Sequence, residues 1–147
     1  MLTQNEADFL LNMHKLLTDN GIVNFPKTGE AKSLDLISED GKEKFIIDIN
    51  RKSTIKIKKC TYQKRYRTYI ILLRLDIEGS PHTNPDGEVI LGAHFHIYKE
   101  GFGDAWAYPI PTTITDPSDL IQTLIDFLNY CKVINIDQLK IQRGLLP

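Results

Sequence analysis

The chain has 147 residues, of which 41% are hydrophobic and 25% are charged, and its 18 basic and 19 acidic side chains nearly cancel. This composition predicts one soluble domain over residues 1–147 and excludes a collagen-like, disordered or disulfide-framework protein. No apolar run approaches the ~18 residues of a membrane span, so we expect no membrane association and a cytoplasmic location. The two cysteines, Cys60 and Cys131, lie far apart without metal-ligand spacing, and we expect both to be reduced.

The first residues predict an amphipathic helix. Thr3 followed by Glu6 fits a capping box. Apolar residues then recur at helical spacing until Asn20 and Gly21 end the pattern: Phe9, Leu10, Met13, Leu16 and Leu17.

The middle of the chain predicts a sheet. Residues 32–38 and 44–50 predict a hairpin around an Asp-Gly turn, and Ile55 and Ile57 alternate with lysines as in a strand. Further strands are expected at 65–77, 93–98 and 105–109. No helix-length crossover separates these segments, so we expect antiparallel pairing.

The C-terminal part returns to helical spacing. Asp116 suits an N-cap and Pro117 the first helical position, before an apolar stripe that begins at Leu120. Asn135 is expected to cap a short final helix through Lys140. The predicted fold is α+β: a meandering antiparallel sheet of about five or six strands, with the N-terminal helix and the C-terminal helices packed on one face.

The charges are unevenly distributed. Residues 51–74 hold nine basic side chains and no acidic one, although the whole chain is nearly neutral. Such a segment attracts phosphates and predicts nucleic-acid binding. Six residues are expected to contact it: Arg51, Lys56, Lys58, Lys64, Arg65 and Arg67. The alternative is a solvated hairpin whose lysines prevent edge-to-edge aggregation.

Three of the four histidines fall between positions 82 and 96. Period two on a strand places His94, His96 and Tyr98 on one face and the apolar residues between them on the other. The polar loop before this strand brings His82 and Asp86 toward the same end of the sheet. We therefore predict one pocket lined by all three histidines.

Two residues of the next segment are expected near this pocket. Asp104 is a candidate for its rim, although Asp104 and Asp86 also suit turns. Trp106 is expected in the pocket wall if its strand face is that of the histidines, where it would stack on a base, and in the core otherwise.

The run HTNPDG, followed by HFHIYKEGFGDAWAYPI, resembles the signature of an uncharacterised family of short bacterial and prophage proteins. The resemblance implies a bacterial or phage source and a single small domain. It assigns no chemical role to the matching residues, among them His82, Asn84, His94 and His96.

These residues predict a small nucleic-acid-binding protein that acts as a metal-independent endoribonuclease, of the toxin or phage-defence type. In such a reaction one imidazole accepts the 2′-OH proton and another protonates the leaving oxygen, which suits the ordinary histidine pKa near 6.5. His82, His94, His96 and Tyr98 are the candidate catalytic residues. RNA is expected over DNA, and no cofactor is required.

Two alternatives remain open. A divalent metal is the first, held by His94 and His96 with His82 or Asp86 as a further ligand. The second is a non-catalytic protein that binds a host protein or an antitoxin-like partner, in which the histidines are structural.

Overall fold

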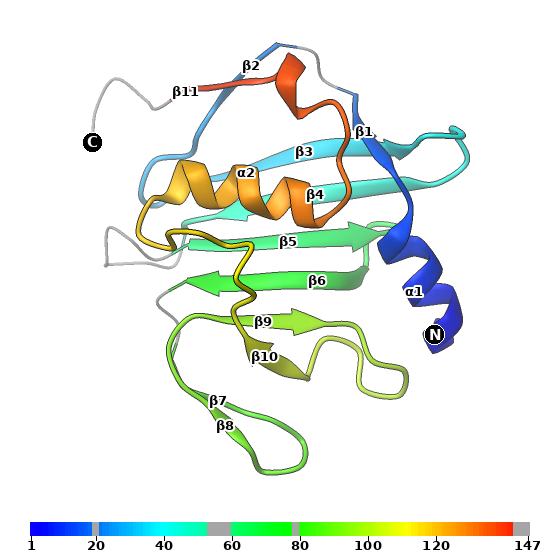
Figure 1. Ribbon diagram of the computed structural model, residues 1–147, viewed down its shortest axis with the longest axis vertical. Coiled ribbons are helices and arrows are strands. Elements are labelled where there is room, and N and C mark those ends of the chain that lie inside the picture. The colour runs from blue at the N-terminus through cyan, green and yellow to red at the C-terminus, as the bar shows by residue number, and fades with distance from the viewer. Residues whose placement is uncertain (19–20, 53–59, 78–79, 143–147) are drawn as a thin grey trace.

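The computed structural model describes residues 1–18, 21–52, 60–77 and 80–142. Its main feature is a seven-stranded sheet in the order β1-β3-β4-β5-β6-β9-β10, in which every neighbouring pair is antiparallel (Figure 1). The strands are β1 (Lys15–Leu17), β3 (Ala31–Ser38), β4 (Lys44–Asn50), β5 (Cys60–Tyr66), β6 (Ile70–Ile77), β9 (His94–Ile97) and β10 (Ala107–Pro109). The fold is α+β, as predicted, and the sheet is larger than expected.

The remaining elements surround this sheet. The helices are α1 (Gln4–Asn12), α2 (Leu120–Tyr130) and the 3₁₀ helix η1 (Ile136–Gln138). Two smaller strand pairs complete the structure: β2 (Ile22–Asn24) with β11 (Lys140–Gln142), and β7 (His82–Thr83) with β8 (Val89–Ile90). Within the described ranges, no helix combines the length and apolar character needed to cross a membrane.

Helix α1 begins as predicted and ends early. The Thr3 hydroxyl accepts from the Glu6 amide, and the Glu6 carboxylate accepts from the Thr3 amide, so the capping box is confirmed. The helix stops at Asn12, and Leu17 lies in β1, paired with β3. The apolar spacing was misleading because Leu17 is buried by strand pairing, whereas Phe9 is 66% exposed.

Thr3→Ala is expected to lower the free energy of unfolding by about 1 kcal/mol, because it removes an N-cap acceptor from α1. Urea denaturation measures this change. Thr112→Ala, at an exposed loop position, is the control. Equal stability of both variants would show that the cap contributes nothing.

The expected strand over 65–77 is in fact parts of two strands. Arg67 and Thr68 have φ values of 53° and 66°, and they reverse the chain between β5 and β6. Consecutive left-handed residues match the right-handed twist of a hairpin. Neither residue is a glycine, so no glycine marks the turn between the two strands. The expected strand around Ile55 and Ile57 lies outside the described residues.

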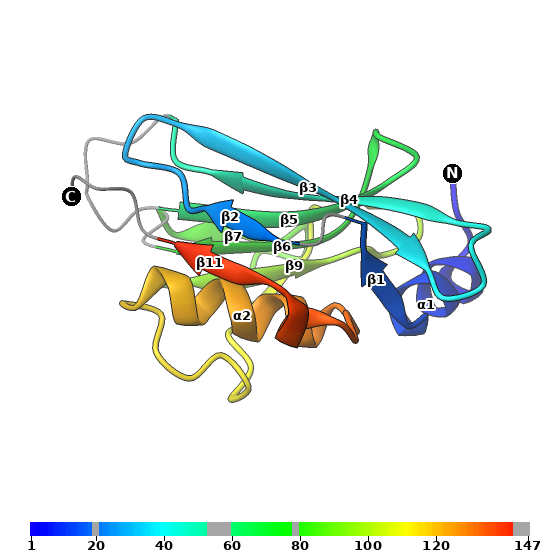
Figure 2. The same cartoon turned by 90° about the horizontal axis from the view of Figure 1, so that it is seen from above.

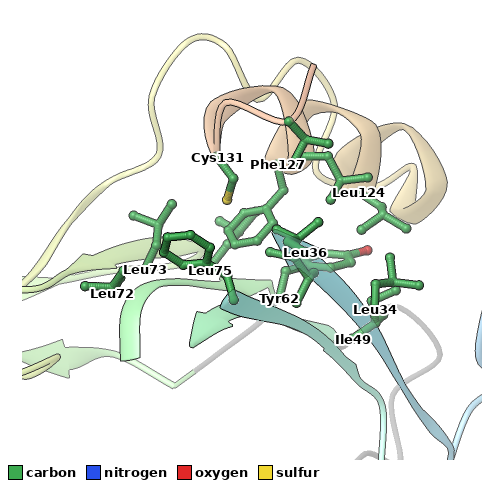
Figure 3. Close-up of a cluster of buried hydrophobic side chains, with 14 of the residues drawn as sticks. Leu34, Leu36, Ile49, Tyr62, Leu72, Leu73, Leu75, Leu124, Phe127 and Cys131 are labelled. Carbon is green, nitrogen blue, oxygen red and sulfur yellow. The ribbon is translucent and has the colours of Figure 1, made fainter. Parts of the chain in front are cut away.

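Helix α2 lies across one face of the sheet (Figures 1 and 2). Phe127 projects from it into the core, where its ring centroid lies 5.9 Å from that of Tyr62 and 6.0 Å from that of Phe95. Figure 3 shows Leu124 and Cys131 pointing toward the same cluster of buried side chains.

Two predictions about the C-terminal helices are wrong. Asp119, not Asp116, caps α2, because the Asp116 carboxylate accepts from the Ser118 amide in the preceding turn. Asn135 does not cap a helix through Lys140: its side-chain amide bonds the backbone N–H and C=O of Leu17. The chain after η1 instead forms β11, parallel to β2.

Candidate histidine site

Strand β9 divides its side chains between the two faces of the sheet. Phe95 contacts Phe127 of α2 and therefore faces the core. His94 and His96 alternate with Phe95 and face away from α2. Pairing with β6 places Asp76 opposite His94, and the next residue on the same face of β6, Arg74, opposite His96.

The β7–β8 hairpin brings the third histidine. Ring centroids of His82 lie 5.6 Å from His94 and 4.7 Å from His96, and those of His94 and His96 are 4.8 Å apart. All three line one pocket, as predicted. The hairpin is held there by Asn84, whose side chain bonds both the N–H and the C=O of Ala107 in β10.

The pocket has a volume of about 440 Å³ and a mostly polar lining. Besides the histidines, its wall includes Arg74 and Asp76 from β6, together with Asn50, Thr61 and Gln63 from β4 and β5. His94 is 3% exposed and His96 is 1% exposed, so both rings lie at its floor. His82 is only partly buried.

Each histidine has one ring nitrogen hydrogen-bonded to a backbone carbonyl. His82 Nε2 lies 2.8 Å from the Ala105 oxygen, His94 Nδ1 lies 2.9 Å from that of Gly92, and His96 Nδ1 lies 2.8 Å from that of Asp104. A carbonyl oxygen only accepts, so these nitrogens carry the protons. In the neutral rings the other nitrogens, His82 Nδ1, His94 Nε2 and His96 Nε2, carry lone pairs.

Asp76 and Arg74 set the electrostatics of the pocket. One Asp76 carboxylate oxygen lies 3.4 Å from both His94 Nε2 and His96 Nε2. The Arg74 guanidinium lies 3.3 Å from the other Asp76 oxygen and donates to Asp104 at 2.7 Å. Burial raises the pKa of Asp76, but His96 and the Arg74 charge more than reverse this, so its pKa lies below the ordinary value. The carboxylate is therefore ionised at neutral pH.

Three other predicted site residues lie elsewhere. Tyr98 is buried and its hydroxyl donates to the Leu2 carbonyl, so it is directed toward the N-terminus and does not line the pocket. Trp106 packs edge-on against Phe102 and is also absent from the pocket lining. Asp86 is exposed and accepts from the Glu88 amide, which fixes the β7–β8 turn. Tyr98 and Trp106 therefore do not form the pocket wall, and Asp86 does not lie in the pocket as a metal ligand.

Asp104, which was expected at the rim of the pocket, contacts two of the residues that line it. Its carboxylate holds Arg74, and its carbonyl accepts from His96. It therefore positions two side chains of the pocket.

The predicted phosphate-binding residues do not form one surface. Lys64 lies on the α2 side of β5 and is fully buried, so no phosphate reaches its amine in this fold. Arg51 is also buried and donates to the Pro26 carbonyl and the Thr28 hydroxyl.

Arg65 and Arg67 differ in exposure. Arg65 forms an ion pair with Asp48 on the face of the sheet that carries the histidines. Arg67 is exposed, and its guanidinium lies over the Tyr66 ring. Lys56 and Lys58 lie outside the described residues.

Asp76, Arg74 and Asn84 belong to the site, although none was a predicted site residue. The signal for the first two is their alternation with the buried residues Leu73, Leu75 and Ile77, which places both charges on the face opposite the core. Their distance to the histidines depends on β6 pairing with β9, which no local pattern encodes.

The chain belongs to a family of unknown function, DUF6978, whose model matches residues 2–133. No curated protein and no solved structure matches it. Membership of an uncharacterised family was expected and is confirmed. The histidine-rich run as its signature and a bacterial or phage source stay predictions.

Proposed function

We propose that this member of the DUF6978 family binds nucleic acid and cleaves phosphodiester bonds at the histidine pocket, with RNA preferred to DNA. The observation that carries the proposal is the convergence of three imidazoles beside Arg74 in one polar pocket. Imidazole is the side chain best suited to proton transfer at neutral pH. RNA is favoured because its own 2′-OH is the nucleophile, so the protein only has to move protons and stabilise charge.

The hydrogen bonds of the histidines suit this chemistry. Because each ring is held by a backbone carbonyl, His94 and His96 present their Nε2 atoms toward the pocket in a fixed orientation. Such a nitrogen accepts the 2′-OH proton, and a protonated neighbour returns one to the leaving oxygen. Arg74 supplies positive charge within the pocket for the developing charge on phosphorus.

The test is cleavage of mixed RNA and single-stranded DNA by the purified protein. Replacing His82 or His96 by Ala is expected to lower RNA cleavage by roughly 10²-fold or more, because each removes a proton-transfer group. The control is His14→Ala, since His14 is exposed on the loop between α1 and β1 and lies outside the pocket.

Thermal unfolding of each variant separates lost chemistry from lost structure. His82 is the more informative position, because its ring is less buried than that of His96. Absence of RNA and DNA cleavage by the wild type, or equal cleavage by a folded His82→Ala variant, would contradict the proposal.

A second candidate is a non-catalytic protein that binds a host protein or an antitoxin-like partner. It is favoured by two hydrogen bonds to backbone carbonyls. His82 connects the β7–β8 hairpin to Ala105, and His96 connects β9 to Asp104 in the loop before β10. In that case the histidine variants change stability and no catalytic activity exists to be lost.

A further inference from the structure

Two ring nitrogens and one carboxylate oxygen meet at the floor of the histidine pocket. His94 Nε2 and His96 Nε2 each lie 3.4 Å from the same oxygen of Asp76. In the neutral rings both nitrogens present lone pairs, and the carboxylate is an anion. Three electron-rich atoms this close, with little solvent around the two rings, require a positive charge among them.

The spacing of these atoms fits a metal ion. Two ligands about 2.1 Å from a tetrahedral ion lie about 3.4 Å apart, because the tetrahedral edge is about 1.6 times the bond length. The two contacts of Asp76 have this length. One ring nitrogen from each of His82, His94 and His96 also lies within 4.8 Å of the other two, so His82 belongs to the same group.

The outer contacts are also those of metal ligands. A metal-bound histidine usually donates its second ring N–H to a carbonyl or carboxylate, which fixes its tautomer and orientation. His82, His94 and His96 all have such a carbonyl partner. A structural hydrogen bond would explain one ring, but all three rings line the same pocket and each has a nitrogen within 4.8 Å of the others.

Arg74 supplies the positive charge in the metal-free state. One of its terminal nitrogens lies 3.0 Å from His96 Nε2, which therefore accepts, and its Nε lies beside Asp76. Its other terminal nitrogen is held by Asp104 at the rim. A bound ion requires the guanidinium to withdraw toward Asp104, so Arg74 and the metal compete for the same ligands.

We propose that Asp76, His82, His94 and His96 form a binding site for a first-row divalent metal ion, with Zn²⁺ the best match. Three imidazoles and one carboxylate favour zinc over magnesium or calcium, which prefer oxygen ligands. The sequence favoured a metal-free site because Asp86 and Asp104 suited turns. Asp76, from the neighbouring strand, provides the missing carboxylate.

The site is that of the proposed function, and the inference rests on that function only for what the ion does there. A ring nitrogen that binds the ion does not also transfer a proton, so the proton transfer described above belongs to the metal-free state. In the loaded protein the ion itself would stabilise charge on a phosphate oxygen. Zinc binding itself is measured without RNA, so either proposal can fail while the other holds.

The experiment is calorimetric titration of the chelator-treated full chain with Zn²⁺, with Mg²⁺ as the comparison ion. One equivalent of Zn²⁺ is expected to bind, and Mg²⁺ is not. Asp76→Asn and His94→Gln are expected to weaken zinc binding by about 100-fold or more, since each removes a direct ligand and outer-shell changes alone cost 10–100-fold. His14→Ala is the matched control and is expected to bind as the wild type does.

Two further measurements do not require a folded ligand variant. Arg74→Gln is expected to tighten zinc binding by roughly tenfold, because it removes a competing positive charge next to Asp76. Co²⁺ added to the wild type is expected to give the visible absorption bands of a tetrahedral site. No zinc binding by the wild type, or unchanged binding by folded Asp76→Asn and His94→Gln variants, would overturn the inference.

Discussion

Lys64→Met is expected to make the protein more stable, by about 1–3 kcal/mol at pH 7, because it replaces a buried amine with an apolar group of similar length. Lys64 is fully buried on the α2 side of the sheet, and its Nζ has no hydrogen-bond partner in the described part of the chain. The Lys64 Nζ lies 5.9 Å from the centroid of the Phe45 ring, which is a weak cation–π contact.

A second lysine, Lys15, is buried next to Lys64. Lys15 is also fully buried, but its Nζ donates to the carbonyls of Leu11, Met13 and Cys131. Burial and the nearby Lys64 charge nevertheless lower the pKa of Lys15 to about 6. Burial lowers the pKa of Lys64 below its ordinary 10.5 as well, so a proton on either amine destabilises the folded protein.

The stabilisation should depend on pH. Between the lowered pKa of Lys64 and 10.5, the unfolded chain binds more protons than the folded chain, so the free energy of unfolding of the wild type rises with pH. Lys64→Met removes this cost. Its advantage over the wild type is therefore largest near pH 7 and shrinks as the pH approaches about 10.

Urea denaturation at pH 7 and pH 10 measures both effects. The matched control is Lys44→Met, since Lys44 is exposed at the start of β4. A Lys64→Met variant that is less stable than the wild type would show that Lys64 has a favourable partner in the folded protein. Equal stabilisation at both pH values would show that the protonation of Lys64 does not cause the gain.

Asn84→Ala is expected to lower the free energy of unfolding by about 2–4 kcal/mol. The Asn84 side chain donates to the Ala107 carbonyl at 2.9 Å and accepts from the Ala107 amide at 2.7 Å. Asn84 is 5% exposed and Ala107 is 1% exposed. Truncation leaves two buried backbone groups without these partners, and each costs about 1–3 kcal/mol.

The same substitution should loosen the pocket without removing any of its proposed metal ligands. With Asn84 truncated, the hairpin keeps the His82 bond to Ala105 as a link toward β10. We therefore expect faster amide hydrogen exchange in β7 and β8 and a zinc affinity lowered by roughly tenfold.

Asn129→Ala is the control for this variant, because Asn129 is exposed at the end of α2. Unchanged exchange in the hairpin would show that Asn84 is not its main anchor. Unchanged zinc affinity in a variant with a loosened hairpin would remove His82 from the ligand set.

Local patterns predicted much of the site. Period two along 94–98 placed His94 and His96 together, and β9 confirms it, because side-chain alternation is a property of the strand alone. The same rule failed for Tyr98. Tyr98 lies one residue past the end of β9, is part of the core cluster, and its hydroxyl donates to the carbonyl of Leu2, which lies 96 positions away in the chain.

Counting basic residues along 51–74 does not show on which face of the sheet each side chain lies. Nine basic residues between positions 51 and 74 indicated one phosphate-binding surface. Lys64 and Arg65 are adjacent in the chain, yet Lys64 is buried beneath α2 and Arg65 pairs with Asp48 on the other face. A residue on the α2 side of the sheet is buried, whereas one on the other face can be exposed to solvent, and the number of basic residues does not distinguish the two.

The sequence by itself determined the elements whose causes are local: the capping box at Thr3, the strands β3, β4, β6, β9 and β10, and the shared face of His94 and His96. Tertiary structure alone decided that β6 pairs with β9 and that the β7–β8 hairpin folds back against β10. Asp76 and Arg74 meet the histidines through that pairing, because long-range strand partners are selected by burial of the whole core and not by any short motif.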